Sequence, residues 1–535
     1  MKKALLSLLA FATYLTCSAQ TIKNSKLEED SWGWHNSLIN WRCLASHPCG
    51  IKDGLVYIKA TPTKFLPHDS LYCYDPKTEQ FTGKTSLDGG ILLTDKYNIK
   101  QFKFEFEKES KVWKLDMETF AEKTLEKKST KNILTFDLPK GTAYNLYRNI
   151  SADSSKYINF LSIEVEKDVR RQYCIVYDRL TDEITKRELE ITTKLPYYII
   201  DNVHVTNEGD PLLSIRSYDK DKINKADNKC IEIQFFTENN VEKTYRKIEK
   251  GESIKTVTAK ELHDGRIFWA ALTRTDKVSY LYHSMTKKSD IEDCEVKRYE
   301  FSDMWKEHQK TSLTKYSQMD IDYVQELDNG KIVLSGFPYS IITTCTNNSC
   351  VNKNWWGGFY VMTINKENDV ENCNLVERRA KKLNSLTASL QEMNIYYDAF
   401  TYGNDFYLMF NESTKKIEKG NVNAFYKIKD KEGYIMLYKL DEDGKSELKS
   451  ISGSTASQRI YNRYLGHDGN KFYVLTRNND LGSVSTIELP AVSTKDFTRR
   501  ETKKTIATTE VKKSTPAEKT TITVQSSRRK RTVKR

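Results

Sequence analysis

Proline is scarce in this chain, at 10 of 535 residues, and no apolar run anywhere is long enough to cross a bilayer. A membrane-spanning helix needs about 20 consecutive apolar residues. The nucleophile motif G-x-S-x-G, the phosphate-binding P-loop, the dinucleotide motif G-x-G-x-x-G and the zinc motif H-E-x-x-H are also missing. These absences exclude the enzyme classes that these four motifs identify. Paired carboxylates of a glycoside hydrolase stay open, because they meet only in the fold.

The sequence also contains no spacing that is typical of metal ligands. The eight histidines are scattered singly, and His263 and His467 occupy corresponding positions beside Asp-Gly, where a turn explains them. The stretch Asp441-Glu-Asp-Gly444 lacks the rest of a calcium loop and is interpreted as a hairpin turn. We therefore expect no metal site and no cofactor, and the sequence identifies no catalytic residue.

The ten cysteines show no zinc-binding spacing. Two pairs lie close in sequence among loop-forming residues, Cys43 with Cys49 and Cys345 with Cys350, so that a short disulfide bridge is geometrically feasible in each. Cysteines in apolar runs, such as Cys174 and Cys230, are expected to be buried as free thiols.

The first nineteen residues have the three parts of a signal peptide. Lys2-Lys3 is positive, residues 4–15 are apolar, and Cys17-Ser18-Ala19 are small residues suited to a signal peptidase. We expect cleavage before Gln20, no transmembrane span afterwards, and a secreted, periplasmic or cell-surface protein. A lipid anchor on Cys17 is the alternative, although Thr16 fits a lipoprotein signal poorly.

Nearly all of the net charge of +12 lies in the C-terminal tail. Residues 493–535 hold fourteen Lys and Arg against four Asp and Glu, a net charge of +10. Lys2 and Lys3 supply the remaining +2, so that residues 20–492 are neutral overall. The tail has few large apolar residues and cannot offset the entropy lost on ordering, so we expect disorder. Its terminal run Arg528-Arg529-Lys530-Arg531 is interpreted either as a passive solvated segment or as an electrostatic anchor to an anionic surface.

Internal repeats organise the body of the chain. Asp290-Ile-Glu-Asp-Cys294 corresponds to Asp369-Val-Glu-Asn-Cys373, and each follows an alternating apolar run and a polar turn. This pattern predicts a strand, a tight turn and a second strand. Such turns are expected near residues 77, 118, 180, 239, 288, 367, 442 and 480.

A glycine turn precedes most of these hairpins. Glu261-Leu-His-Asp-Gly265 corresponds to Glu326-Leu-Asp-Asn-Gly330, and Gly209, Gly403 and Gly469 recur in the same context. Asp-Gly and Asn-Gly between apolar runs indicate a hairpin, because these residues tolerate a positive φ. Each repeat therefore holds about four strands, which matches the length of one propeller blade with loop insertions.

Seven or eight such units in series resemble a β-propeller. The resemblance is one of architecture and matches no named repeat family. It implies an all-β domain of about seven or eight four-stranded blades over residues 50–492, after an N-terminal Trp-rich segment at residues 20–49. A stack of β-sandwiches and a β-helix are the alternatives. Residues 304–318 and 381–393 are predicted to be helical insertions. The pattern of residues 116–128 fits either a short helix or a strand.

Tryptophan gives the one indication of a site. Trp32, Trp34 and Trp41 lie near the N-terminus, and Trp355-Trp356 follows the loop between Cys345 and Cys350. Aromatic rings on a polar loop offer contact area to a sugar ring or a protein, and packing at blade edges is the alternative.

Three functions follow as hypotheses. The first is an extracytoplasmic binding or scaffold protein that holds a protein or glycan on its propeller loops, with the basic tail as a tether to an anionic surface. The second is a secreted polysaccharide hydrolase with acidic residues at the mouth of the central channel. The third is a component of a cell-surface export or adhesion assembly.

Overall fold

The computed structural model describes most of the body of the chain. The described residues are 23–26, 51–52, 54–60, 69–87, 92–94, 99–166, 169–220, 226–238, 240–275, 278–301, 318–346, 349–356, 358–376, 380–385, 397–413, 426–427, 434–450, 458–478 and 481–489. The signal sequence, Trp32, Trp34, Trp41, the pair Cys43 and Cys49, and the basic tail lie outside them. The chain divides after Pro490 into two units, and all the described strands belong to the first.

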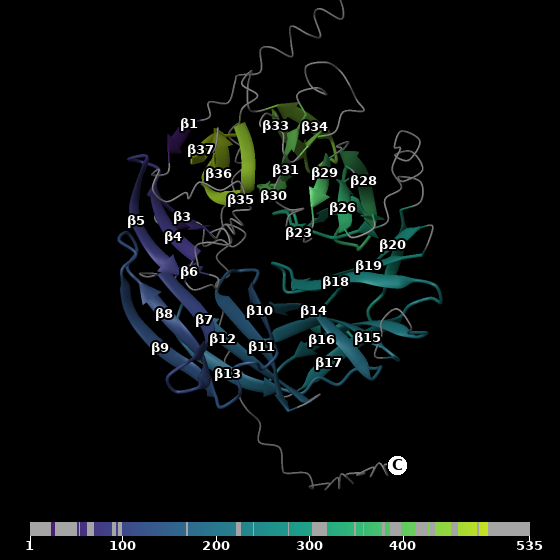
Figure 1. The fold of residues 1–535 in the computed structure, drawn as a ribbon. Coiled ribbons are helices and arrows are strands. Elements are labelled where there is room, and N and C mark those ends of the chain that lie inside the picture. The colour runs from purple at the N-terminus through teal and green to yellow at the C-terminus, as the bar shows by residue number, and fades with distance from the viewer. Residues whose placement is uncertain are drawn as a thin grey trace, which may run out of the picture. The chain divides into compact units, whose positions relative to one another are not determined.

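Eight four-stranded antiparallel sheets follow one another around a central axis, as the blades of a β-propeller (Figure 1). Blades 1 to 4 comprise β2 (Ile51–Lys52), β3 (Leu55–Ala60), β4 (Asp69–Asp75) and β5 (Gln80–Leu87); β6 (Leu92–Thr94), β7 (Ile99–Glu107), β8 (Val112–Phe120) and β9 (Lys127–Phe136); β10 (Tyr144–Ile150), β11 (Lys156–Glu166), β12 (Val169–Asp178) and β13 (Ile184–Leu189); and β14 (Tyr197–Val205), β15 (Pro211–Tyr218), β16 (Lys229–Phe236) and β17 (Val241–Lys247).

Blades 5 to 8 continue in the same order, with one 3-10 turn, η4 (Lys288–Asp290), before the last strand of blade 5. They comprise β18 (Ser253–Glu261), β19 (Ile267–Arg274), β20 (Ser279–Thr286) and β21 (Lys297–Glu300); β23 (Tyr323–Glu326), β24 (Ile332–Gly336), β27 (Phe359–Ile364) and β28 (Val370–Val376); β30 (Tyr397–Tyr402), β31 (Asp405–Glu412), β33 (Tyr434–Leu440) and β34 (Ser446–Ser450); and β35 (Gln458–Asp468), β36 (Lys471–Asn478), β37 (Leu481–Glu488) and β1 (Lys23–Lys26).

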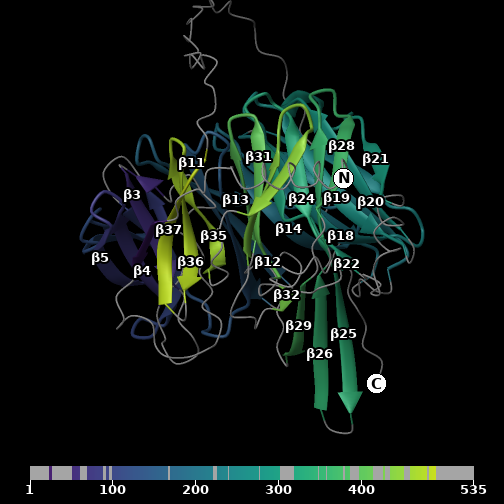
Figure 2. The ribbon, with the colours of Figure 1, turned by 90° about the horizontal axis from the view of Figure 1, so that it is seen from above.

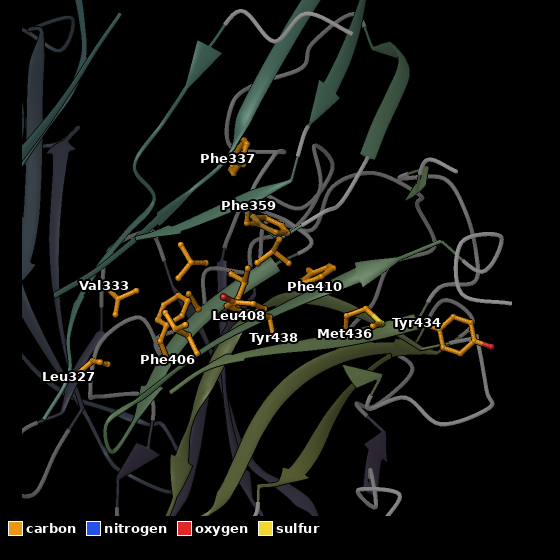
Figure 3. Packing of buried hydrophobic residues seen from close by; sticks show 14 residues of the cluster. Leu327, Val333, Phe337, Phe359, Phe406, Leu408, Phe410, Tyr434, Met436 and Tyr438 are labelled. Carbon is orange, nitrogen blue, oxygen red and sulfur yellow. The ribbon is translucent and has the colours of Figure 1, made fainter. Parts of the chain in front are cut away.

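The blades are held together by apolar layers between neighbouring sheets. The second and third strands of a blade are covered on both faces, which is why runs such as β19 and β27 are apolar without alternation. Between blades 6 and 7, for example, Phe359 packs against Phe410 with ring centroids 5.2 Å apart, in a cluster that draws residues from both sheets (Figure 3). Burial of such side chains is the main stabilising term.

The ring closes through both ends of the domain. β35 of blade 8 contacts β2 and β3 of blade 1. The outer strand of blade 8 is β1, which pairs antiparallel with β37 in the register Lys23 with Thr486 through Lys26 with Ser483. A strand from the start of the chain therefore completes the last blade.

Two faces of the ring can be distinguished by this topology. In each blade the first-to-second connection lies on one face, the turn face, and so does the third-to-fourth connection of blades 1 to 7. The second-to-third connections and the links to the next blade lie on the other, the loop face. Predicted turn glycines all have positive φ, including Gly265 at +85° and Gly330 at +77°, and they lie on the turn face.

Polar hydrogen bonds link successive blades on the turn face. The backbone N–H of Asp153 donates to the side chain of Asn207 at 3.0 Å, and the N–H of Asn207 donates to Glu261 at 2.6 Å. One blade further on, the N–H of His263 donates to Glu326 at 2.8 Å. Glu261 and Glu326 are the repeated glutamates of the sequence motif and both are buried. The repeat therefore encodes an interblade contact as well as a turn.

Most of the sequence-based expectations for the fold are confirmed. The all-β propeller is present, and hairpin turns lie near residues 77, 180, 239, 288, 367 and 442, while the turn near 480 falls on two residues that are not described. The turn expected near residue 118 is wrong, because β8 runs through that position and the turn comes at residues 121–126. Residues 116–120 and 127–128 are strand, and residues 381–385 belong to a strand rather than a helix.

Candidate functional site

Blades 5 to 7 carry an additional five-stranded sheet on the loop face, the loop-face sheet. Each of its strands comes from a connection on that face. They are β22 (Gln318–Met319), β25 (Pro338–Thr346), β26 (Ser349–Trp356), β29 (Ala380–Ser385) and β32 (Tyr426–Lys427). β25 and β26 form a hairpin inserted between two strands of blade 6, and Figure 2 shows this hairpin extending away from the blades.

This hairpin contains the residues that the sequence singles out. Cys345 and Cys350 occupy directly opposite positions of its two strands, and Ser340 and Tyr339 lie opposite Trp355 and Trp356. The sequence indicates a polar loop here, whereas the backbone is an extended ladder. The hairpin is rich in Ile, Thr, Tyr, Val and Trp, which are favoured in strands, and this explains the difference.

A cluster of charged residues, the mouth cluster, lies on inner strands of blades 4 and 5 and in the link before blade 6. It consists of Asp201 in β14, Arg216 in β15, Lys255 in β18 and Asp320 after β22. Asp201 and Lys255 sit at β-bulges, where the registers of β14 with β15 and of β18 with β19 shift by one residue. A bulge redirects a side chain and is common beside functional sites. Asp320 directly follows β22, which joins the mouth cluster to the base of the loop-face sheet.

An ion pair fixes one of these bulges. Arg216 donates to Asp201 Oδ1 from Nε at 2.8 Å and from Nη2 at 2.6 Å. The pair reaches into the next blade, where Asp201 Oδ2 accepts from the N–H of Val257 at 2.9 Å and Arg216 donates to the carbonyl of Ile254 at 3.3 Å. These two backbone groups flank Lys255, so the ion pair holds the segment that presents this lysine.

The remaining two charges of the mouth cluster are perturbed by burial. Desolvation raises the pKa of Asp320 to about 6, although the backbone N–H of Ile321, Arg216 and Lys255 oppose the shift. Desolvation also lowers the pKa of Lys255, and the neighbouring Arg274 and Arg216 add to this effect. Groups with such shifts are candidates for ligand contact or proton transfer. Asp201 has both oxygens engaged and is a positioning residue.

The mouth cluster is not evident from the sequence. Asp201 belongs to blade 4, Lys255 to blade 5 and Asp320 to the link between blades 5 and 6, and no spacing along the chain indicates a bulge. Two other positions lie where the sequence places them: His263 is in a turn, and Asp441 Oδ1 accepts from the N–H groups of Asp443 and Lys445 at 3.1 and 2.8 Å. Cys174 and Cys230 are buried free thiols.

Metal centres and membrane-spanning helices are both absent from the part of the chain that the structure describes. No group of three or more His, Cys, Asp or Glu is arranged to hold a metal ion there. Likewise, no helix among these residues has the length and hydropathy of a membrane span.

Comparison with known proteins gives no family. No protein-family model and no curated protein matches the chain. Solved structures that resemble it include the WD40 domain of SCAP from fission yeast, at 9% identity and a TM-score of 0.32 over 84% of this chain and 98% of that one. The β-propeller domain of the Trilobed protease from Pyrococcus furiosus is 12% identical, with a TM-score of 0.33 over 76% of this chain and 94% of that one. The polysaccharide lyase Uly1 is 11% identical, with a TM-score of 0.32 over 89% of this chain and 98% of that one. At these values the likeness carries no functional argument, and the propeller rests on its own eight sheets.

Proposed function

We propose that this protein is an extracytoplasmic binding or scaffold protein that holds a protein or glycan ligand on the loop face. The observation that carries the proposal is the loop-face sheet. Four separate connections from blades 5 to 7 are ordered into one sheet that projects from the ring, and each ordered residue costs about 1–2 kcal/mol of backbone entropy. Loops that a rigid scaffold positions in this way commonly carry binding sites.

Two further features support a ligand on this face. Trp355 and Trp356 lie in β26, and Trp is among the residues most enriched at binding hot spots. The mouth cluster lies at the base of the same sheet and supplies Lys255 and Asp320 for a polar group of the ligand. The signal-peptide pattern of residues 1–19 supports export, and the basic tail supplies a tether to an anionic surface.

Binding measurements on the full-length protein test this function. We expect one member of a panel of immobilised polysaccharides and extracytoplasmic proteins to bind, and the double change Trp355→Ser and Trp356→Ser to weaken that binding at least tenfold. Tyr245→Ser is the control, because Tyr245 is 55% exposed on the outer strand of blade 4, away from the loop-face sheet. Equal loss of binding in both variants, or no loss in either, contradicts the assignment of this face.

Intact-mass analysis of the exported protein tests export separately. A first residue other than Gln20, or a lipid on Cys17, contradicts simple cleavage.

A polysaccharide hydrolase is the second candidate, and Asp320 favours it. A carboxyl group with a pKa of about 6 keeps its proton to a higher pH than an ordinary aspartate, as a general acid must. The usual mechanism also needs a second carboxylate. Asp201 does not fill that role, because Arg216 and the N–H of Val257 occupy both of its oxygens. Release of reducing sugar that Asp320→Asn abolishes would establish the hydrolase instead of the binding protein.

A further inference from the structure

A second surface site lies on blade 2, away from the loop-face sheet. A depression of about 520 Å³ is lined by Phe106, Lys108, Lys111, Asp137, Leu138, Pro139 and Lys140. Its two walls are the turn between β7 and β8 and the connection from β9 to β10, both on the loop face. The volume falls in the range of roughly 300–1,000 Å³ that is usual for small-ligand sites.

The walls of this depression are held by polar and aromatic contacts. Trp113 Nε1 donates to the carbonyl of Pro139 at 2.9 Å, and the N–H of Thr142 donates to the same carbonyl at 3.0 Å. Phe106 packs against Trp113 with ring centroids 5.6 Å apart. The apolar wall formed by Phe106 and Pro139 is therefore fixed in position before any ligand arrives.

The charge of the depression is positive. Three of its lining side chains are lysines, Lys108, Lys111 and Lys140, against one carboxylate, Asp137. None of these three lysines has an ion-pair partner among the described residues, which include the whole of residues 99–166. The nearby Glu107 is already paired with Lys114 at 2.6 Å and accepts from Ser110, so it does not neutralise them.

We propose that this depression binds an acidic saccharide, with the carboxylate of a uronic acid unit on Lys108, Lys111 and Lys140 and the ring face against Phe106 and Pro139. Lysine hydrogen bonds to a carboxylate are charge-assisted and strong. An aromatic face beside the charges selects a ligand that carries a flat apolar surface as well as an anionic group. Inorganic anions have no such apolar surface. The site is separate from the mouth cluster and does not depend on the function proposed for it.

Saturation-transfer NMR on the full-length protein tests the proposal, with trigalacturonate as the ligand and its methyl ester as the uncharged counterpart. We expect saturation of the sugar ring protons with the acid, much less with the ester, and a loss of affinity of at least tenfold when Lys108, Lys111 and Lys140 are changed together to Gln. Phe106→Leu should reduce the saturation of ring protons more than it reduces affinity.

Two control variants separate this site from general charge attraction. Lys131→Gln removes one lysine charge from an exposed position of β9 outside the depression. Neutralisation of Arg528-Arg529-Lys530-Arg531 to Gln tests the tail. Both should keep binding within about twofold. Three results would overturn the proposal: unchanged affinity in the triple lysine variant, equal binding of the ester, or complete loss of binding in the tail variant. Competition by inorganic phosphate without any saturation of ring protons would also overturn it.

Discussion

At the scale of single residues, the repeated glutamate of the turn motif is an interblade acceptor. Glu326 is buried and accepts both the backbone N–H of His263 at 2.8 Å and its Nδ1 at 3.0 Å. The hydrogen bond to Glu326 raises the pKa of His263, and Asp328 adds to the shift while burial and Lys260 oppose it. A repeat position that looks like simple turn chemistry thus also links two blades.

The pH dependence of stability follows from that contact. Because the pKa of His263 is raised on folding, its contribution is fully present below the ordinary histidine value near 6.5 and is lost as pH rises through the raised value. The His263 side chain is 59% exposed, so the effect stays below about 1 kcal/mol. We expect the melting temperature to fall less between pH 6 and 8 in Glu326→Gln than in the wild type. Glu295→Gln is the control, and identical slopes in all three proteins would refute the assignment.

The ion pair beneath Lys255 gives a second residue-scale prediction. Arg216→Met leaves the carboxylate of Asp201, whose side chain is only 9% exposed, without its cation, so we expect a loss of about 3 kcal/mol in the free energy of unfolding. Adding Asp201→Asn should recover part of that loss, since the uncompensated charge is then gone. Urea unfolding of the two single variants and the double variant measures the coupling. Additive effects would mean that the two side chains do not act as a pair.

At the scale of elements, the hairpin of β25 and β26 places Cys345 directly opposite Cys350. Opposite positions of an antiparallel pair have Cα atoms about 4.5–5.5 Å apart, within the span of a disulfide. We predict a bridge between them in the exported protein, because secreted proteins meet an oxidising compartment.

Peptide mapping without reduction decides the pairing. The expected result is a single peptide that contains both residues and is two hydrogen masses lighter than the same peptide after reduction. Cys174 is the internal control, since burial raises its pKa to about 12 and a free thiol should remain there under all conditions short of unfolding. Alkylation of both Cys345 and Cys350 in the native protein would contradict the prediction.

Elements differ in how far the sequence predicts them. Where a turn contains Gly after Asp or Asn, as at Gly265 and Gly330, the local chemistry fixes the hairpin and the prediction is right. The turn after β8 contains no glycine and instead places Leu125 at a φ of +58°, so nothing in its composition marks it and the sequence pattern predicts the turn too early. The loop-face sheet and the mouth cluster depend on contacts between blades, such as Arg216 with Ile254, that no local pattern encodes.

At the scale of the whole molecule, β1 is the only piece of the described N-terminal region that pairs with a blade made from the other end of the domain. We expect deletion of residues 20–27 to cost about 0.5–1.5 kcal/mol for each backbone hydrogen bond lost with β37, and to lower the melting temperature accordingly. The exposed edge of β37 should also promote self-association. Thermal unfolding and size-exclusion chromatography measure both effects, and a monomer of unchanged stability would show that β1 does not close the ring.

The basic tail leads to a complementary prediction. Deletion of residues 493–535 should leave the melting temperature of the propeller unchanged, because every strand described lies before that point. The same deletion should abolish retention on a sulfonate matrix that carries no uronic acid, and retention of the full-length protein should weaken steeply with salt, since charges are screened over about 10 Å at 0.1 M. Paired salt titrations of both proteins on one matrix provide the measurement. Equal and salt-insensitive retention would identify the tail as passive.

The pairing of β1 with β37 also sets the order of events during synthesis. Lys23–Lys26 leaves the ribosome long before its partner Leu481–Glu488, because blades 1 to 7 are synthesised between them. Blades 1 to 7 are built from strands that follow one another in the chain and can form as they emerge. Blade 8 can be completed only after β37 has emerged to pair with β1. The entropy cost of closing so long a loop grows only with the logarithm of its length, so the delay is a matter of timing rather than of stability. A translation product cut short before Leu481 leaves Lys23–Lys26 without a partner, and such an unpaired strand is what chaperones and proteases recognise.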